Sequence, residues 1–164
     1  MSGTRKTVVM LSNTGSEVEF VGDPIRSDNY FGYTDGLHTI QIGYQNFTGG
    51  LGIQGTLSLG DGCPGKANIP DEDWFWIHLA DQSGNCDQYP YLTYPKDPLN
   101  PTADPTQNPW VNPTGDTGTE AFTFIGNFTY LRAVVTRSYI EPPVLPQADG
   151  RFLLGQVDRV LISL

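Results

Sequence analysis

Residues 122–139 read Phe122-Thr-Phe-Ile-Gly-Asn-Phe-Thr-Tyr-Leu-Arg-Ala-Val-Val-Thr-Arg-Ser-Tyr139, and residues 152–164 read Phe152-Leu-Leu-Gly-Gln-Val-Asp-Arg-Val-Leu-Ile-Ser-Leu164. Both stretches are rich in β-branched and aromatic residues, and much of each alternates apolar with polar side chains. Such alternation is typical of a β-strand that buries one face. We therefore predict an all-β chain with a buried closing strand. Its inner face carries Val160, Ile162 and Leu164, with Val157 and Leu161 partly covered on the opposite face.

The same pattern extends toward the N-terminus. Lys6–Ser12 and Glu17–Val21 predict two early strands around a turn at Asn13. Residues 74–79 predict another strand. Two further segments follow the turn signals Asp35-Gly36 and Gly49-Gly50 and are expected to pair as a hairpin. The inner face of the first holds His38, Ile40, Ile42 and Tyr44, and that of the second holds Leu51, Ile53, Gly55, Leu57 and Leu59.

Residues 89–119 differ from the rest of the chain, because they contain seven prolines. Proline cannot join a sheet interior and keeps its preceding residue out of the helical region, so this segment predicts a long extended loop or arm. No amphipathic helix is detectable, and a single helical turn is the most we expect. The sequence predicts one domain, residues 1–164. It is expected to be an antiparallel β-sandwich or jelly roll of about eight strands with one long Pro-rich loop.

Charge and composition exclude several classes of partner. The formal net charge is −9, and residues 61–120 alone hold ten acidic and two basic residues. An acidic protein repels phosphate, so we expect no nucleic-acid partner. No signal peptide and no apolar run long enough to span a membrane are evident, so synthesis in a cytosol and no membrane partner are expected. Only 16% of residues are charged, which suits either a surface covered by neighbours or a Ser/Thr/Asn-rich surface.

The residues that could carry enzyme chemistry have simpler interpretations. Gly50-Leu-Gly-Ile-Gln-Gly55 fits a dinucleotide-binding pattern, but alternation continues through it and no helix follows. His38 and His78 lie inside strand patterns, with no nucleophile motif nearby, so we expect them to serve packing or hydrogen bonding. The acidic run Asp71-Glu-Asp73 is typical of a solvated loop, although it could also contribute to calcium binding or glycoside cleavage. We predict no catalytic, cofactor or metal site.

Aromatic residues offer the best candidates for binding. Trp74 and Trp76 alternate in a strand pattern, which favours core burial over sugar stacking. Trp110, Tyr94 and Tyr91 lie in the Pro-rich segment, where an aromatic side chain either folds back on its own domain or anchors a partner. The sequence leaves open whether Cys63 and Cys86 form a disulfide. Asn46-Phe-Thr and Asn127-Phe-Thr form a weak internal echo that can mark two hairpin corners.

Several quoted motifs resemble small virion structural proteins of tailed bacteriophages, especially the myovirus-like phages of marine cyanobacteria. They are Tyr33-Thr-Asp-Gly-Leu-His-Thr-Ile, Asn46-Phe-Thr-Gly, Ile53-Gln-Gly-Thr-Leu, Asp73-Trp-Phe-Trp-Ile, Phe124-Ile-Gly-Asn-Phe-Thr-Tyr-Leu-Arg-Ala and Gly155-Gln-Val-Asp-Arg-Val-Leu-Ile. The resemblance implies a β-sandwich attached to a capsid or tail, with no catalytic residues.

Three functions compete at this point. The first is a non-enzymatic capsid decoration protein located in the virion. Its expected partners are the major capsid protein or tail proteins and further copies of the chain, as in a trimer. The second is a tail-associated, carbohydrate-binding module for a host surface glycan, which would use the Trp and Tyr residues. The third is a glycan hydrolase, which would need opposed acids that sequence cannot show.

Overall fold

The computed structural model describes residues 6–12, 14, 19–32, 35–47, 49–59, 69–80, 92–94, 116–136 and 155–163. Its strands are β1 (Thr7–Ser12), β2 (Glu19–Val21), β3 (Ile25–Arg26), β4 (Leu37–Phe47), β5 (Gly49–Thr56), β6 (Phe75–Ile77), β7 (Leu92–Tyr94), β8 (Asp116–Ile125), β9 (Tyr130–Thr136) and β10 (Gln156–Ser163). The described helical structure is α1 (Asp28–Phe31) and a 3-10 turn, η1 (Asp71–Asp73). The predicted all-β class is therefore confirmed.

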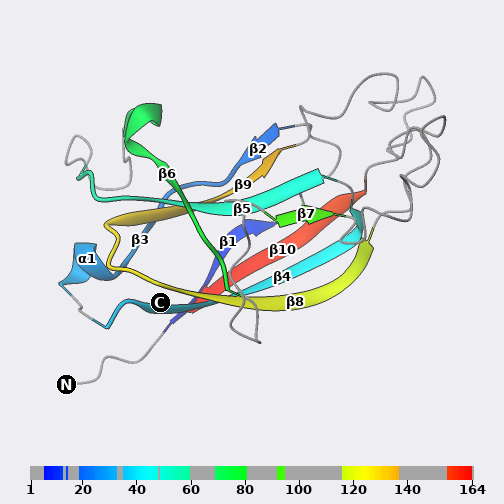
Figure 1. Ribbon diagram of the computed structural model, residues 1–164, viewed down its shortest axis with the longest axis horizontal. Coiled ribbons are helices and arrows are strands. Elements are labelled where there is room, and N and C mark those ends of the chain that lie inside the picture. The colour runs from blue at the N-terminus through cyan, green and yellow to red at the C-terminus, as the bar shows by residue number, and fades with distance from the viewer. Residues whose placement is uncertain are drawn as a thin grey trace.

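The strands form two sheets, and every strand pair is antiparallel (Figure 1). Sheet A has the order β1-β10-β4-β8. Sheet B has the order β2-β9-β5-β6, with β3 also paired to β9 and β7 to β5. This arrangement is the predicted antiparallel β-sandwich.

The eight strands on the main paths of the two sheets pair as a jelly roll. Taken from the chain ends inward, β1 pairs with β10, β2 with β9, β4 with β8, and β5 with β6. Each pair lies inside the previous one along the chain, as in one long hairpin. The pairings β10–β4 and β5–β9 then roll that hairpin into two sheets. As a result β10 lies between β1 and β4, and its inner face is buried because it packs in the core between the two sheets.

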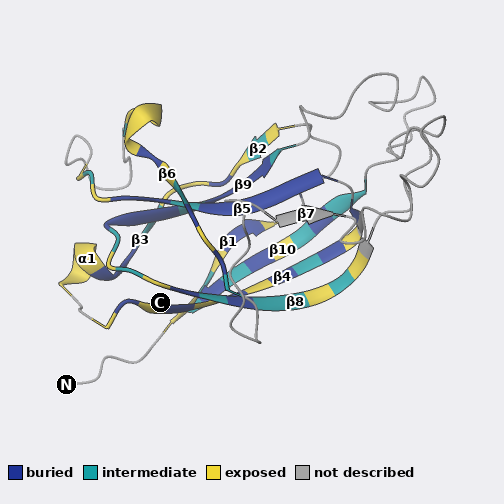
Figure 2. Cartoon of the chain, in the orientation of Figure 1, coloured by how far each residue is buried: buried dark blue, intermediate teal, exposed yellow. Residues whose placement is uncertain are grey.

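The core lies between the two sheets, on the faces that the alternation predicts. The four inward residues of β4 named above are all buried. Ile40, Ile42 and Tyr44 meet Leu51 and Ile53 of β5 and the inner residues of β9 in one apolar cluster. Burying one large aliphatic side chain contributes about 1.5–3 kcal/mol. Buried and exposed residues alternate along β4 and β10, whereas β5 is buried along its length (Figure 2).

The predicted hairpin between the segments around residues 40 and 53 is wrong. β4 belongs to sheet A and β5 to sheet B, so the chain crosses between sheets at residues 47–49 instead of turning back. Gly49 has a φ of 147°, which other residues rarely adopt. β5 ends at Thr56, and Leu57 and Leu59 are 63% and 66% exposed rather than inside. Alternation specifies the face of a residue, but it does not specify the partner strand.

The closing strand is buried as predicted, with one correction. Val160 and Ile162 lie in the core and Leu161 is half-buried, while Leu164 lies outside the described residues. Val157 was expected opposite them but is 0% exposed. The register against β4 shifts between Val157 and Arg159, where β10 carries an extra residue. This bulge turns Val157 to the core side as well.

Two other predicted segments change their limits. The Pro-rich loop of residues 89–119 includes a strand, because β7 pairs with β5 and β8 already begins at Asp116. Residues 95–115 lie outside the described part of the chain. The strand expected over residues 74–79 is shorter, since β6 covers only Phe75–Ile77 and His78 follows it as an exposed residue.

The two Asn-Phe-Thr sequences mark equivalent corners of the sandwich. Phe47 ends β4 before the crossing to β5, and Phe128 lies between β8 and β9. At both places the chain leaves sheet A and enters sheet B, so neither is the hairpin corner that the sequence predicted. Phe47 is fully buried, and the half-buried Phe128 packs against the core. Each corner thus places an aromatic ring between the sheets.

Candidate partner-binding surfaces

The predicted aromatic anchors lie mostly beyond the described residues. Trp110 and Tyr91 are outside them. The backbone of Tyr94 pairs with Gly49 at the end of β7, but its side chain is not described. Cys63 and Cys86 also lie outside the described part. The role of these residues as partner anchors stays a prediction.

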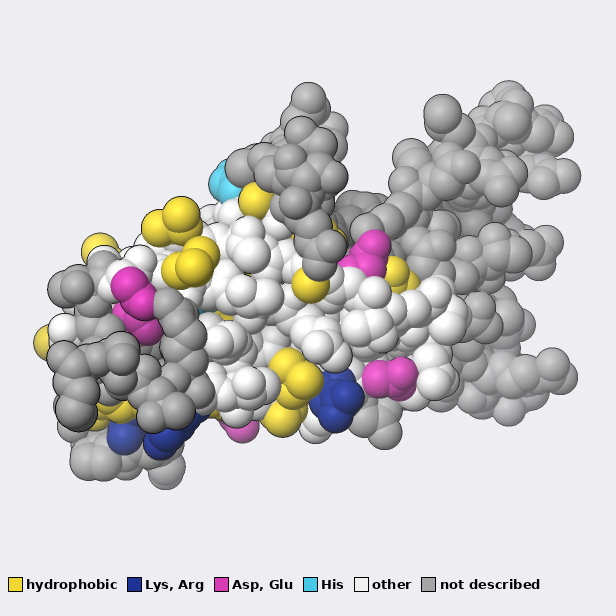
Figure 3. Space-filling model, turned by 90° about the horizontal axis from the view of Figure 1, so that it is seen from below, with side chains coloured by type: hydrophobic (Ala, Val, Ile, Leu, Met, Phe, Trp, Pro, Cys, Tyr) yellow, Lys and Arg dark blue, Asp and Glu magenta, His cyan; other side chains and the backbone are white. Residues whose placement is uncertain are grey.

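Figure 3 shows one face of the described surface, and uncharged polar groups and backbone dominate it. Lys, Arg, Asp and Glu side chains occur singly or in small groups there, which agrees with the low charge content of the sequence. Binding surfaces on this chain must therefore be sought in grooves and apolar clusters rather than in a strong electrostatic field.

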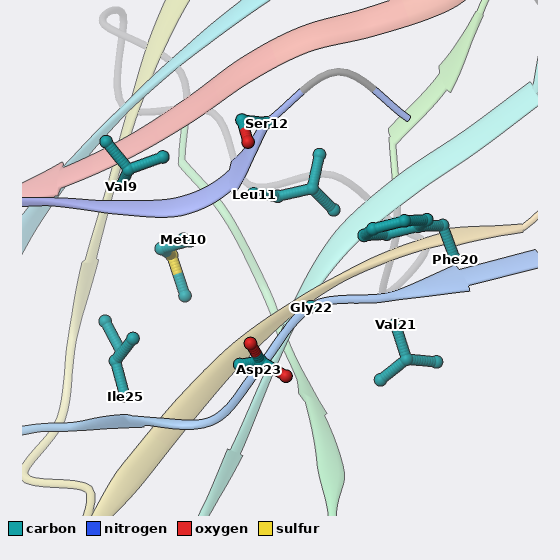
Figure 4. Close-up of a pocket in the computed structure, with 9 residues that line it drawn as sticks. All are labelled: Val9, Met10, Leu11, Ser12, Phe20, Val21, Gly22, Asp23 and Ile25. Atoms are coloured by element: carbon teal, nitrogen blue, oxygen red, sulfur yellow. The ribbon is translucent and has the colours of Figure 1, made fainter. Parts of the chain in front are cut away.

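A groove of about 240 Å³ opens between the edges of the two sheets (Figure 4). β1, the outermost strand of sheet A, forms one wall, and β2 with the start of β3 forms the other. Met10 and Ile25 point toward each other across it (Figure 4). The other residues that line the groove are Val9, Leu11, Ser12, Phe20, Val21, Gly22 and Asp23.

The floor of this groove depends on Gly22. A Cβ atom at this position would lie 2.7 Å from the carbonyl oxygen of Met10. The Gly22 N–H donates a hydrogen bond of 2.8 Å to the Ala133 carbonyl oxygen. Only a residue without a side chain lets β1 approach sheet B this closely. Because β1 and β2 are edge strands, their outer backbone groups border the groove and could pair with an added strand.

A second cluster lies on the outer face of sheet B. Arg132 of β9 donates a 2.8 Å hydrogen bond from Nε to Oε1 of Gln54. Its guanidinium lies over the Trp74 ring, 4.2 Å from the centroid, and Nη2 lies 3.9 Å from Oδ1 of Asp71. Burial lowers the pKa of Arg132, and the nearby Asp71 opposes that shift.

This cluster corrects the expectation for the tryptophans. Trp74 is buried, but it lies outside the apolar core, beneath the Arg132 guanidinium. Trp76 is half-buried and sits beside Gln54 in the same row. A Trp74 face covered by an arginine is unavailable for stacking on a sugar ring.

A third polar cluster is enclosed beneath α1. His38 is 0% exposed, and its Nδ1 and Nε2 atoms lie 3.4 and 3.2 Å from the carbonyl oxygens of Ser163 and Gly126. Nε2 is also 3.7 Å from Oδ2 of the buried Asp28, which accepts a hydrogen bond from the Gly36 N–H. Burial raises the pKa of the Asp28 carboxyl above its ordinary value of 3.8; His38 opposes this shift and Asp35 adds to it.

The buried histidine therefore has the packing and hydrogen-bonding role that the sequence predicted. Its ring also stacks on Phe124, with centroids 4.8 Å apart. The cluster joins α1, β4, the turn after β8 and the end of β10. Enclosure of these side chains leaves no room for a substrate beside them.

The remaining candidates for chemistry are placed as follows. The glycine pattern of residues 50–55 lies within β5, as the alternation predicted. The side chains of Asp71, Glu72 and Asp73 in η1 are exposed. Within the described ranges, no three His, Cys, Asp or Glu residues are grouped so that they could hold a metal ion. None of the described helices is long and apolar enough to cross a membrane.

Sequence reasoning missed the groove, although its signal was present. Four successive apolar residues, 8–11, interrupt the polar alternation of the first strand. A strand of this kind has apolar side chains on both faces and tends to be covered on both.

Comparison of the chain with protein-family models, curated proteins and solved structures found no match.

Proposed function

We propose that this chain is a non-enzymatic virion structural protein of a tailed bacteriophage, and that it decorates the outer surface of the capsid. The observation that carries the proposal is the jelly-roll pairing of its eight main strands. Jelly rolls occur in viral capsid proteins and in lectins. A fold alone does not define a function, so this support is an analogy. The motifs that resemble phage virion proteins point in the same direction.

The surface of the sandwich fits a protein that works by contact. The groove offers two sheet edges and an apolar lining to a neighbouring chain. The expected partners are the major capsid protein or tail proteins, together with further copies of this chain, for example in a trimer. Sparse charge lets such surfaces meet without a large desolvation cost.

Quantitative mass spectrometry of purified phage particles tests the proposal. A decoration protein should be present in tens to hundreds of copies, at a constant ratio to the major capsid protein. Particles that contain the major capsid protein but lack this chain would refute a virion role. A copy number of a few per particle would instead place the chain in the tail.

A carbohydrate-binding tail module is the second candidate, because lectins share the jelly-roll arrangement. The exposed ring of Tyr30 and the neighbouring Arg26 guanidinium, 4.8 Å from its centroid, are groups that can contact a glycan. The covered face of Trp74 counts against it. Binding of the purified chain to host polysaccharide on a glycan array, with loss on Tyr30→Ala, would favour this candidate over decoration.

A further inference from the structure

Exposed apolar side chains gather at one end of the sandwich. The described residues include nine large hydrophobic side chains that are exposed, of which Val9 and Val21 flank the groove. The other seven lie at the end that α1 occupies, on the left of Figure 1, where Figure 3 also shows several yellow clusters. We call them the loop-end patch: Tyr30, Phe31, Leu37, Leu57, Leu59, Phe75 and Ile125.

The segments that carry this patch are neighbours in space. Leu37 of β4 is the cross-strand partner of Ile125, which is 78% exposed. The rings of Tyr30 and Phe31 meet edge to face with centroids 5.3 Å apart. Phe75 lies against Phe128 of the β8–β9 corner, at 5.6 Å between centroids. Exposed apolar side chains that gather at one end of a molecule in this way mark an interaction site.

Hydrogen bonds hold these segments in fixed positions. The Gly126 N–H donates to the Gly36 carbonyl at 2.9 Å, and the Asn29 N–H donates to the Phe128 carbonyl at 3.0 Å. The Thr129 hydroxyl donates to the Leu57 carbonyl at 3.1 Å. The enclosed His38–Asp28 cluster lies directly beneath. The patch is therefore organised before any partner binds, which lowers the entropy lost on binding.

Acidic residues border the patch. Asp35 precedes the Gly36 turn, and Asp71, Glu72 and Asp73 of η1 are all exposed. η1 is connected to this end of the sandwich by β9. Asp71 of η1 lies beside Arg132 of β9. Two residues earlier in β9, the Tyr130 ring contacts the Tyr30 ring of the patch, with centroids 5.6 Å apart. The described basic residues at this end are Lys6, the half-buried Arg26 and the half-buried Arg132, which lies beside Asp71. The border thus carries more exposed acids than bases.

We propose that the loop-end patch is the face by which this chain docks on another virion protein, whose matching surface has an apolar centre and a border rich in lysine and arginine. Charge complementarity selects this occupant, because a second copy of the chain would bring one acidic border against another. The inference rests on the proposed function, and it adds the docking face and the chemistry of the partner surface.

The test uses the full chain and phage particles produced without it. Labelled chain is titrated onto the particles at increasing salt concentration. The apolar variant is Leu57→Ser/Leu59→Ser/Ile125→Ser, and its control is Thr39→Ser/Gln41→Ser/Gln45→Ser on the exposed face of β4. The charge variant is Glu72→Lys, and its control is Asp158→Lys, which makes the same change of charge in β10. Circular dichroism melts verify that each variant is folded.

The apolar variant should bind at least about tenfold more weakly, as expected for loss of central interface contacts. Glu72→Lys should bind a few-fold more weakly and with a flatter salt dependence. Both controls should bind like the unmodified chain. Equal binding by the folded apolar variant, or an equal loss in its β4 control, would overturn the docking face while leaving the proposed function intact. Failure of the unmodified chain to bind particles would overturn the proposed function itself.

A second copy as the occupant is distinguished by light scattering. If the unmodified chain is oligomeric in solution, and the apolar variant is monomeric yet binds particles normally, then the patch joins copies of this chain. That result would overturn the proposal of a basic partner surface.

Discussion

Asp28 shows how a single residue can escape sequence reasoning. The alternation in β4 placed His38 on the inner face, where the structure has it. Asp28 lies in a polar stretch, Ser27-Asp-Asn29, that is typical of an exposed loop. Its burial depends on how the one-turn helix α1 packs over the end of β4, which is a tertiary feature. Local sequence therefore predicts the histidine but not its neighbour.

The raised pKa of Asp28 predicts a pH dependence of stability. The folded chain holds this proton more tightly than the unfolded chain, so the contribution of Asp28 is most favourable at low pH and is lost as pH rises through the raised pKa. Asp28→Asn keeps an acceptor for the Gly36 N–H without the buried charge. The stability of this variant relative to the unmodified chain should therefore increase as pH rises from about 4 to 7. Urea unfolding at several pH values measures it.

Asp73→Asn, at an exposed position, serves as the control for this series. A stability difference between Asp28→Asn and the unmodified chain that stays constant over the pH range would show that Asp28 ionises in the folded protein as it does in the unfolded chain.

Gly22 is the second residue with a sharp requirement for space. Replacement by alanine puts a methyl group against the Met10 carbonyl oxygen. The new methyl group is attached directly to the backbone and the Met10 oxygen is part of it, so neither can rotate away and the two chain segments must move apart. Overpacking of this kind costs about 1–3 kcal/mol. Chemical denaturation of Gly22→Ala should show this loss. Gly43→Ala in β4, where an added Cβ would meet no atom closer than 4.0 Å and φ is not in the left-handed region, provides the matched control. Equal losses in both variants would remove the steric argument.

At the scale of elements, alternation predicted the strands better than their partners. The inner faces of β4 and β10 follow from the sequence, since a period of two fixes which side chains share a face. The crossing at residues 47–49 did not follow, because a short Gly-containing link fits a hairpin and a change of sheet equally well. The bulge beside Val157 could not be predicted either. The extra residue is defined only against the partner strand β4, and the sequence does not show which strand β10 pairs with.

β10 offers the clearest test of the core. Val160 is fully buried between the sheets, so Val160→Asp would enclose an unpaired carboxylate. The free energy of unfolding should fall by about 4–5 kcal/mol, which is enough to unfold many small domains. Arg159→Asp, at the exposed neighbouring position of the same strand, should have little effect. A folded Val160→Asp protein with an unchanged melting temperature would contradict the assignment of this face.

At the scale of the whole molecule, the Pro-rich segment remains a predicted interaction element. Seven prolines and few apolar residues cannot build a core of their own, and the apolar cluster described here comes from the strands of the two sheets. Replacing residues 98–113 by a Gly/Ser linker of equal length should leave the melting temperature nearly unchanged. It should also weaken assembly onto the particle, because a flexible linker loses more entropy on docking than a proline-rich chain. Normal assembly of this variant would show that the segment has no such role.

The pairing of β1 with β10 also determines when the protein can fold. Thr7 faces Ser163, so sheet A cannot close until residue 163 has left the ribosome. Chains whose strands pair across such long separations fold on the order of milliseconds to seconds. Until then, the apolar residues 8–11 are available to other nascent chains, which favours aggregation at high rates of synthesis. Soluble yield should therefore rise when fewer chains are initiated per unit time, because fewer nascent chains with uncovered apolar residues 8–11 then meet one another.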